Sequence, residues 1–342
     1  MGEFDVIERF FKRPERQLAR AAFVAMGIGD DCALVQARPG TQIAISSDML
    51  VQGRHFFESV DPQALGHKAL AVNLSDLAAC GAKPLAFTLA LALPKIDAAW
   101  LDKFSSGLFA LSDQQGCELV GGDTTQGPLN ICITVLGEIP LQNGQSQALL
   151  RSGAKPGDDL YVSGTLGDAR LALEVMRGNL QLEDAQFQVA RERLERPTPR
   201  VALGQALRGI ASAAIDVSDG LLGDLRHVLK ASRVGATIRT DQARAMLATQ
   251  SALLTALANP GVPTDTQLTA RRWLGYVLAG GDDYELAFTA PKAARAAVAA
   301  AAASAHTPVS CIGQIDTELG LRLVDAFGAA VENHFPSFDH FE

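Results

Sequence analysis

Carboxylates next to glycine or hydroxyl residues recur along the chain, and clusters of this kind could hold metal ions. The first is the pair Asp30-Asp31, which follows a glycine-containing stretch at residues 27–29. Comparable combinations lie at Ser46-Ser47-Asp48, Ser75-Asp76, Gly121-Gly122-Asp123, Asp216-Val217-Ser218-Asp219 and Gly280-Gly281-Asp282-Asp283. Each alone is ordinary turn chemistry. If they converge in the fold, they form an oxygen-only site for hard divalent cations and, through those cations, for a polyphosphate.

Other ways of building a nucleotide or catalytic site are missing from the sequence. There is no P-loop, and the pair Gly27 and Gly29 lacks the third glycine of a dinucleotide-binding fingerprint. The signatures of protein kinases and a Gly-x-Ser-x-Gly elbow are also absent. The six histidines have no paired metal spacing, which disfavours zinc or iron. Many acids with few titratable bases suit phosphoryl transfer, in which the acids bind metal ions and no side chain is a discrete acid or base.

The composition excludes several classes of protein. A chain of 342 residues exceeds the usual size of one domain, so two domains are expected. The formal net charge is -8 and no Lys/Arg-rich run of five or more residues is present, so neither nucleic acid nor a membrane is an expected partner. The five cysteines form no CxxC pair, which argues against a zinc site and a disulfide framework. Because no signal peptide and no long apolar run are found, we expect a cytoplasmic protein.

Two predicted strands lead directly into acidic motifs. A strand at 42–46 would place Ser47 and Asp48 where that strand ends. A strand at 118–120 runs into the glycines at 121–123, which would let the backbone approach a phosphate. A plain turn at these glycines is the alternative.

The segment 62–80 is predicted to be a helix, because Asp61 and the following proline begin it and Gly81 ends it. Asp76 falls on the apolar stripe of this helix rather than on its solvated face. A carboxylate that points inward needs a metal ion or a partner, and Lys68 or a backbone amide are the alternatives to a metal.

In the second half, a short strand at 213–217 carries Asp216 near its end, and a helix follows to about residue 232. Ser218 and Asp219 would lie at the N-terminus of this helix, where free backbone amides favour anions. Simple capping of the helix by one of these two residues is the alternative.

The remaining elements follow from periodicity and from glycine and proline. A helical lead-in is expected at 2–25, and a polar connection at 142–147 separates the two halves. Further strands are expected at 32–36, 87–93, 131–139, 160–163, 286–289, 308–315 and 321–324, and further helices at 97–115, 169–177, 271–278 and 292–305.

Seven segments together carry a family resemblance. They are GIGDDCAL at 27–34, ISSDMLVQGRHF at 45–56, AVNLSDLAACGAKP at 71–84, GGDT at 121–124, RSGAKPGD at 151–158, IDVSDGL at 215–221 and GGDDYEL at 280–286. In this order they resemble the thiamine-monophosphate kinase family, which belongs to the aminoimidazole-ribonucleotide-synthetase-like superfamily. The resemblance extends from about residue 3 to Phe341.

The resemblance implies an α/β fold of the α+β type with two domains. Residues 1–140 would bind ATP and Mg²⁺ and form a homodimer through a mixed sheet, and residues 151–342 would form an α/β sandwich that completes the nucleotide and substrate cleft. The implied reaction is ATP-dependent phosphorylation of thiamine monophosphate to thiamine diphosphate, by direct in-line transfer with several Mg²⁺ ions.

The resemblance also implies roles for individual residues. The implied magnesium ligands are Asp31, Ser46, Ser47, Asp48, Asp76, Asp123, Asp216 and Asp219. Asp30 would support these ligands without binding the metal ion directly. The implied ATP contacts are Gly122, Asp123, Arg151 and Ser218. The implied contacts to the thiamine substrate are His55, Asp282 and Phe338.

Two other interpretations stay open. The chain could be a sister enzyme, such as an aminoimidazole ribonucleotide synthetase, a selenophosphate synthetase or a hydrogenase-maturation relative. The absence of a cysteine before the first aspartate motif disfavours selenophosphate synthesis. The second interpretation is a non-catalytic scaffold that binds metal and nucleotide. The substitution Asp76→Asn distinguishes the two, because an enzyme would lose turnover whereas a scaffold would change only in metal affinity.

Overall fold

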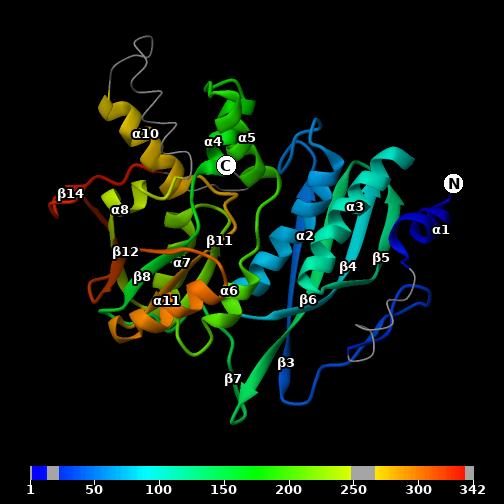
Figure 1. Cartoon of the computed structure of the whole chain (residues 1–342), viewed down its shortest axis with the longest axis horizontal. Helices are drawn as coiled ribbons and strands as arrows, with labels where there is room; N and C mark the ends of the chain where they lie inside the picture. The colour runs from blue at the N-terminus through cyan, green and yellow to red at the C-terminus, as the bar shows by residue number, and fades with distance from the viewer. Residues whose placement is uncertain (1, 14–22, 248–265, 336–342) are drawn as a thin grey trace. The chain divides into compact units, whose positions relative to one another are not determined.

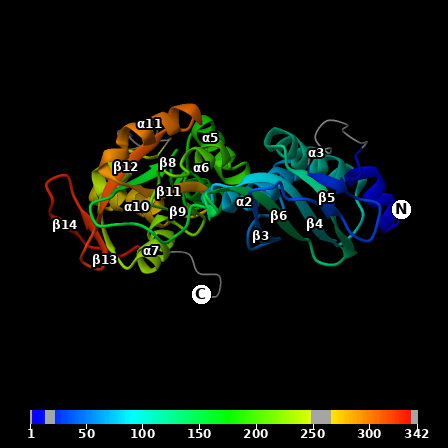
Figure 2. The same ribbon diagram turned by 90° about the horizontal axis from the view of Figure 1, so that it is seen from below.

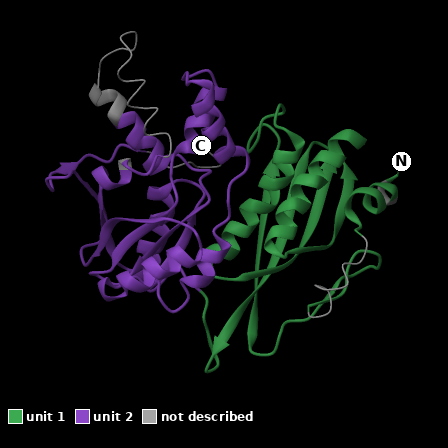
Figure 3. Ribbon diagram, in the orientation of Figure 1, with its two compact units in different colours: residues 1–148 green, residues 149–342 purple. Residues whose placement is uncertain are grey.

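The computed structural model describes residues 2–13, 23–247 and 266–335, and the chain divides into two compact units (Figures 1 and 3). Unit 1 comprises residues Met1–Ala148, and unit 2 comprises residues Leu149–Glu342. Each unit combines a mixed sheet with helices, which confirms the α/β fold expected from the sequence. Within the described ranges no helix is long and apolar enough to cross a membrane. The cytoplasmic location stays a prediction.

Unit 1 is built on a sheet with two helices packed against it (Figure 2). Its elements are α1 (Glu3–Val6), the π-helical turn η1 (Ile7–Phe11), β1 (Val24–Met26), β2 (Leu34–Val35), β3 (Thr41–Val51), α2 (Pro62–Ala79), β4 (Lys83–Leu93), α3 (Ala98–Gln115), β5 (Glu118–Gln126), β6 (Asn130–Gln142) and β7 (Gln145–Ser146). The strand order is β3-β6-β4-β5, with β7 added to β6. β6 is antiparallel to β3 and β4, whereas β4 and β5 are parallel.

Local signals explain both long helices of unit 1. The carboxylate of Asp61 accepts a hydrogen bond from the amide of Gln63 at 3.3 Å and so caps α2. Asp97 accepts bonds from the amides of Ala99 and Trp100 and caps α3 in the same way. Gly116 ends α3 with a φ of +62°, a left-handed conformation that glycine adopts without strain. Both predicted helices are confirmed.

The predicted helical lead-in at 2–25 was wrong in its extent. The first helical stretch ends at Phe11, Lys12 and Arg13 are not helical, and β1 begins at Val24. Val24 lies opposite Val35 in a small antiparallel sheet of β1 and β2. Sheet pairing therefore overrides the helix-like spacing of apolar residues at this end of the segment.

The predicted strand at 42–46 was too short. β3 pairs with β6 along its whole length, from Thr41 opposite Pro140 to Val51 opposite Asn130. Because the backbone hydrogen bonds continue through the polar residues, Ser47 and Asp48 lie inside the strand and not at its end.

Unit 2 contains a seven-stranded mixed sheet of the order β14-β13-β10-β12-β8-β11-β9. Its elements are β8 (Asp159–Ser163), α4 (Asp168–Met176), α5 (Asp184–Glu195), α6 (Val201–Ala206), β9 (Ala213–Val217), α7 (Leu221–Ser232), β10 (Gly235–Arg239), α8 (Thr240–Arg244), α10 (Thr266–Ala279), β11 (Glu285–Ala290), the 3-10 turn η3 (Lys292–Ala294), α11 (Arg295–Ser304), β12 (Val309–Asp316), β13 (Gly320–Val324) and β14 (Ala330–Val331). Helices α6 and α11 pack side by side (Figure 1), and α7 packs against both α10 and β9.

The core of unit 2 forms where apolar strands meet the helices. Val162 of β8 and Ile215 of β9 are buried together with Leu225 of α7 and Val277 of α10. β8, β11 and β9 are buried at every position, which is why short apolar runs predicted them well. The ends of β9 and β11 carry the acidic motifs of this unit.

Candidate functional site

A cleft of about 620 Å³ in unit 1 gathers four of the predicted site residues. It is bounded by η1, the turn after β1 and the strand β5. Asp30 and Asp31 line it from the turn, and Gly122 and Asp123 line it from β5. The fold therefore brings together two acidic motifs that lie about ninety residues apart in the sequence.

The strand β5 continues through the glycines, where the sequence had predicted that the strand ends. β5 stays parallel to β4 as far as Gln126. Gly122 has a φ of +147°, and a Cβ atom at this position would lie 1.8 Å from the carbonyl oxygen of Leu89 in β4. Close approach of the neighbouring strand therefore requires this glycine. Whether its backbone also contacts a phosphate stays a prediction.

The two carboxylates of the Asp30-Asp31 pair have different surroundings. The side chain of Asp30 accepts a hydrogen bond from the amide of Asp31 at 2.9 Å, which stabilises the turn. The exposed carboxylate of Asp31 makes no hydrogen bond or ion pair within the described part of the chain. The two carboxylates thus differ in their partners, and the role of Asp31 as a metal ligand stays a prediction.

A second group of predicted ligands lies between β3 and α2. The hydroxyl of Ser46 donates to the carboxylate of Asp76 at 2.5 Å, so Asp76 points from α2 toward the sheet, as its position on the apolar stripe predicted. The backbone of Asp48 is fixed by its amide, which donates to the side chain of Asn73 at 3.0 Å. Because side chains alternate along a strand, Ser46 and Asp48 share one face of β3.

The hydroxyl of Ser47 lies on the opposite face of β3. It is within hydrogen-bonding distance of the hydroxyl of Thr134 at 2.9 Å and close to the sulfur of Cys132. A straight strand therefore separates the side chain of Ser47 from those of Ser46 and Asp48. The role of Ser47 as a ligand stays a prediction.

His55 follows β3 in a tight turn. Its Nδ1 atom accepts a hydrogen bond from the amide of Val51 at 3.0 Å. This bond assigns the proton of a neutral imidazole to Nε2. The predicted contact of His55 with the thiamine substrate is not tested by this geometry.

In unit 2, β9 and the turn before α7 carry two predicted metal ligands, Asp216 and Asp219, and one predicted ATP contact, Ser218. Asp216 is buried within β9, and Ser218 and Asp219 follow the strand directly. The amides of Ser218 and Asp219 both donate to one carboxylate oxygen of Asp224, each at 3.1 Å. The prediction that these amides are free for an anion was therefore wrong, because an acid from the first turn of α7 already accepts from them.

Asp224 was missed by the sequence analysis. Its side chain is buried, and burial, reinforced by the nearby Asp219, raises the pKa of Asp224 to about 7. Arg151 is close enough to oppose this pKa shift. The sequence signal that could have identified Asp224 is an acid four residues after Gly220, at the start of a predicted helix.

The loop of Arg151 is held by the other end of α7. The hydroxyl of Ser232 accepts bonds from the amides of Gly153 and Ala154 and donates to the carbonyl of Arg151 at 3.2 Å. The side chain of Arg151 is exposed. Both predicted ATP-binding segments of unit 2 are thus fixed by residues of one helix.

Asp282 lies in a strained loop before β11. Its φ is +60° and that of Tyr284 is +51°, values that residues with a Cβ atom rarely adopt. The amide of Asp282 donates to the carbonyl of Ser218 at 2.8 Å, so this loop lies beside the Ser218-Asp219 segment. Phe338, the other predicted substrate contact of this unit, lies outside the described residues.

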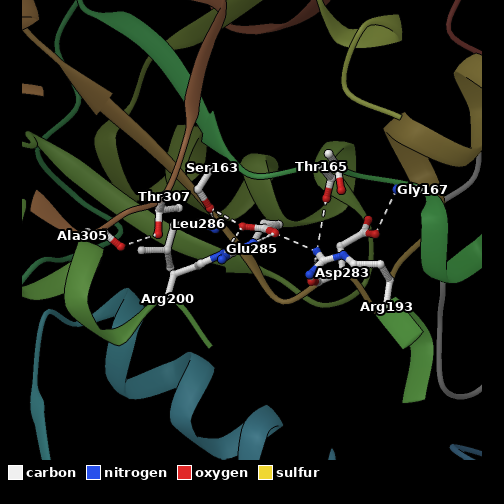
Figure 4. A network of polar contacts seen from close by, with 10 residues as sticks. All are labelled: Ser163, Thr165, Gly167, Arg193, Arg200, Asp283, Glu285, Leu286, Ala305 and Thr307. Carbon is white, nitrogen blue, oxygen red and sulfur yellow. Dashed lines mark hydrogen bonds and ion pairs between the residues drawn. The ribbon is translucent and has the colours of Figure 1, made fainter. Parts of the chain in front are cut away.

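Behind this loop is a buried ionic network, shown in Figure 4. The side chain of Glu285 is fully buried and is paired with Arg193 and Arg200 at 2.6 and 2.5 Å. The hydroxyl of Ser163 donates to the same carboxylate at 2.5 Å. The pairing offsets the cost of burying this charge. Of Ser163, Arg193, Arg200 and Glu285, only Glu285 lies in a sequence motif described above.

Asp283 is also buried, beside this network. One oxygen of its carboxylate accepts from the amide of Gly167 at 2.9 Å, and the other has no hydrogen-bond partner among the described residues. Burial raises the pKa of Asp283 well above its ordinary range. The bond from Gly167 connects this loop to the residue that precedes α4.

The donor atoms of these groups fit a hard divalent cation. Every predicted ligand offers carboxylate, hydroxyl or backbone oxygen and none offers sulfur or nitrogen. In the described ranges no three His, Cys, Asp or Glu residues lie close enough together to hold a metal ion. Mg²⁺ is usually bound through one or two carboxylates together with phosphate oxygens and water, and pairs such as Asp31 and Asp123 suit that pattern.

Within unit 1 the two groups of ligands lie on opposite edges of the sheet. Asp48 of β3 pairs with Ile133, which lies opposite Leu89, which in turn pairs with Gly122 of β5. Three strand spacings separate these edges by about 14 Å. One ion therefore cannot be shared between the two edges within one chain, whereas several ions could be held.

Two family matches define the class of protein. The N-terminal domain of AIR synthase related proteins matches residues 29–139, and the C-terminal domain of the same proteins matches residues 155–325. A hydrogenase maturation protein of Escherichia coli, HypE, shares the fold at 20% identity with a TM-score of 0.68, covering 91% of this chain and 92% of its own. The predicted two-domain aminoimidazole-ribonucleotide-synthetase-like fold is confirmed.

Closer relatives narrow the class to one family. The thiamine-monophosphate kinase of Salmonella typhimurium is 45% identical over 344 residues, which cover 99% of this chain and 98% of the relative. The crystal structure of the thiamine-monophosphate kinase from Stenotrophomonas maltophilia K279a is 43% identical with a TM-score of 0.78, covering 91% of this chain and 93% of that one. AaThiL, solved in complex with AMPPCP and TMP, is 28% identical with a TM-score of 0.73 over 90% and 89% of the two chains. The chain therefore belongs to the thiamine-monophosphate kinase family of phosphotransferases, as the sequence motifs predicted.

Proposed function

We propose that this chain transfers the γ-phosphoryl group of ATP directly to thiamine monophosphate, which gives ADP and thiamine diphosphate. The observation that carries the proposal is the cleft of unit 1, where the carboxylates of Asp31 and Asp123 line one space with the backbone of Gly122. The names of the relatives and the AMPPCP and TMP ligands of AaThiL support the choice of substrates.

The acids act as ligands, and bound Mg²⁺ supplies the neutralisation of charge that a polyphosphate needs. The ligands in unit 1 are Asp31, Ser46, Ser47, Asp48, Asp76 and Asp123, and those in unit 2 are Asp216 and Asp219. Gly122, Arg151 and Ser218 bind the nucleotide. His55, Asp282 and Phe338 contact the thiamine substrate and so orient it for in-line transfer. No side chain is needed as a general base, because a phosphate oxygen is already ionised at neutral pH.

The proposal includes a homodimer formed by the N-terminal domain. On β3 the side chains of Ile45 and Met49 are 65% and 51% exposed, on the face that carries Ser47 and not Ser46. Apolar side chains exposed at alternate positions of one strand are typical of a surface that another chain covers. A second copy of the same sheet would bury them.

The test uses the purified protein with ATP, MgCl₂ and thiamine monophosphate, and separates thiamine diphosphate by chromatography. Thiamine without its phosphate is the control acceptor and should give no product. Asp31→Asn should lower kcat on the order of 100-fold, whereas Asp30→Asn keeps an oxygen for the amide of Asp31 and should lower it less. A wild-type protein that forms no thiamine diphosphate would refute the proposed reaction.

A further inference from the structure

The loop at residues 281–284 requires support, because its backbone is unfavourable. Asp282 and Tyr284 have φ values of +60° and +51°, which residues with a Cβ atom rarely adopt. Strained conformations of this kind persist only where the surrounding structure holds them. The backbone bonds from Asp282 to the carbonyl of Ser218 and from Tyr284 to the carbonyl of Val217, both 2.8 Å, tie the loop to the end of β9.

Arg193 of α5 holds the other side of this loop. One guanidinium nitrogen, Nη2, donates to the carbonyl oxygen of Asp283 at 3.3 Å and to that of Thr165 at 3.4 Å (Figure 4). The same nitrogen is anchored on the buried carboxylate of Glu285 at 2.6 Å. A single side chain therefore connects α5, the segment after β8 and the strained loop.

Arg200 is paired with the same carboxylate but has no such connection. It binds Glu285 through Nε and Nη2 at 2.6 and 2.5 Å, and its side chain is 15% exposed against 16% for Arg193. No hydrogen bond from Arg200 to the loop is found among the described residues. The two arginines thus match in charge, burial and partner and differ in their contact with the loop.

We infer that Arg193 is a positioning residue that fixes the carboxylate of Asp282 for the acceptor substrate, through the backbone of Asp283. The inference depends on the proposed function, because it takes Asp282 as a contact of thiamine monophosphate. The Ser218-Asp219 segment on the nucleotide side has a further support that does not involve Arg193, since the carboxylate of Asp224 accepts hydrogen bonds from the amides of both residues. Loss of Arg193 should therefore weaken the binding of the acceptor substrate and leave the binding of the nucleotide unchanged.

The experiment compares Arg193→Gln with Arg200→Gln in the full-length enzyme. Each variant leaves Glu285 paired with the other arginine, so similar losses in melting temperature are expected. Arg193→Gln should raise the KM for thiamine monophosphate about tenfold or more, with the KM for ATP unchanged within about twofold. Arg200→Gln should leave both KM values near those of the wild type.

A double-mutant cycle tests whether Arg193 acts through the loop. In an Asp282→Ala background, Arg193→Gln should add no further increase in the KM for thiamine monophosphate, because the carboxylate that it positions is gone. If Arg193→Gln does not fold, Arg193→Lys keeps a positive charge for Glu285 on a side chain that is one atom shorter, so its nitrogen no longer reaches the carbonyls of Thr165 and Asp283, and the same increase in KM is expected.

The outcomes separate the two proposals. An inactive wild-type enzyme would overturn the proposed function and this inference with it. An active wild type in which the two arginine variants change KM equally, or in which the effects of Arg193→Gln and Asp282→Ala multiply, would overturn the inference alone.

Discussion

Asp224 should make the folding stability of unit 2 depend on pH, and Asp224→Asn should remove that dependence. The carboxylate is buried and accepts from two amides, and burial raises its pKa from the ordinary 3.8 to about 7. The folded state therefore keeps a proton between these two values that the unfolded state has released. Because the unfolded state binds fewer protons in this window, stability falls as the pH rises from about 4 to about 7.

The size of the effect follows from the two pKa values. Relative to acidic solution, the contribution of Asp224 to the free energy of unfolding has fallen by roughly 2 kcal/mol at about pH 5.5. At about pH 8 it has fallen by roughly 4 kcal/mol. Between these two conditions the wild type should therefore lose about 2 kcal/mol more than Asp224→Asn. The amide oxygen of asparagine can still accept from the amides of Ser218 and Asp219, so the variant should fold.

The assay is urea unfolding at both pH values, with EDTA present so that no metal ion binds to Asp219. The chain has two tryptophans, and in a Trp100→Phe background the remaining Trp273 reports from the core of unit 2. Other titrating groups are common to both proteins and cancel in the difference. Parallel stability curves for the wild type and the variant would refute the assignment of a raised pKa to Asp224.

Three further predictions concern unit 1. Gly122→Ala should lower the unfolding free energy by about 2 kcal/mol or more, because the new Cβ meets the carbonyl of Leu89 at an unfavourable φ; an unchanged urea midpoint would contradict this. Ile45→Glu should convert a dimer into monomers in sedimentation velocity, whereas Ile96→Glu, exposed outside the sheet, should not. Asp76→Asn keeps an acceptor for Ser46 and should retain the melting temperature while turnover falls on the order of 100-fold; retained turnover would remove Asp76 from the ligands.

Elements with local signals could be predicted from the sequence. Helix α2 begins where Asp61 caps it and α3 ends at Gly116, and neither signal needs information from a distant residue. The inward position of Asp76 also followed from helical periodicity and is confirmed by its bond with Ser46.

The strand β3 could not be predicted in full, because its pattern is inverted. Ser46 and Asp48 share the face that meets α2, while Ile45 and Met49 are exposed on the other face. Alternation normally places apolar residues against the helices of the same chain. The inversion is explained if the polar face binds metal ions and the apolar face packs against a second copy of the chain. Neither the ions nor the second copy can be inferred from the alternation pattern of one strand.

The two Asp-Asp pairs show most clearly what only the fold can decide. In each pair one carboxylate accepts a backbone amide and stabilises the local chain, namely Asp30 from its neighbour Asp31 and Asp283 from the distant Gly167. The residue that binds the amide is the first of one pair and the second of the other. The remaining carboxylates also differ, since that of Asp282 accepts a hydrogen bond from the hydroxyl of Tyr284 at 3.3 Å. Spacing and residue type are identical, so the sequence alone cannot assign the roles. The position of the acceptor amide assigns them, and in the second pair that amide belongs to a loop more than one hundred residues away.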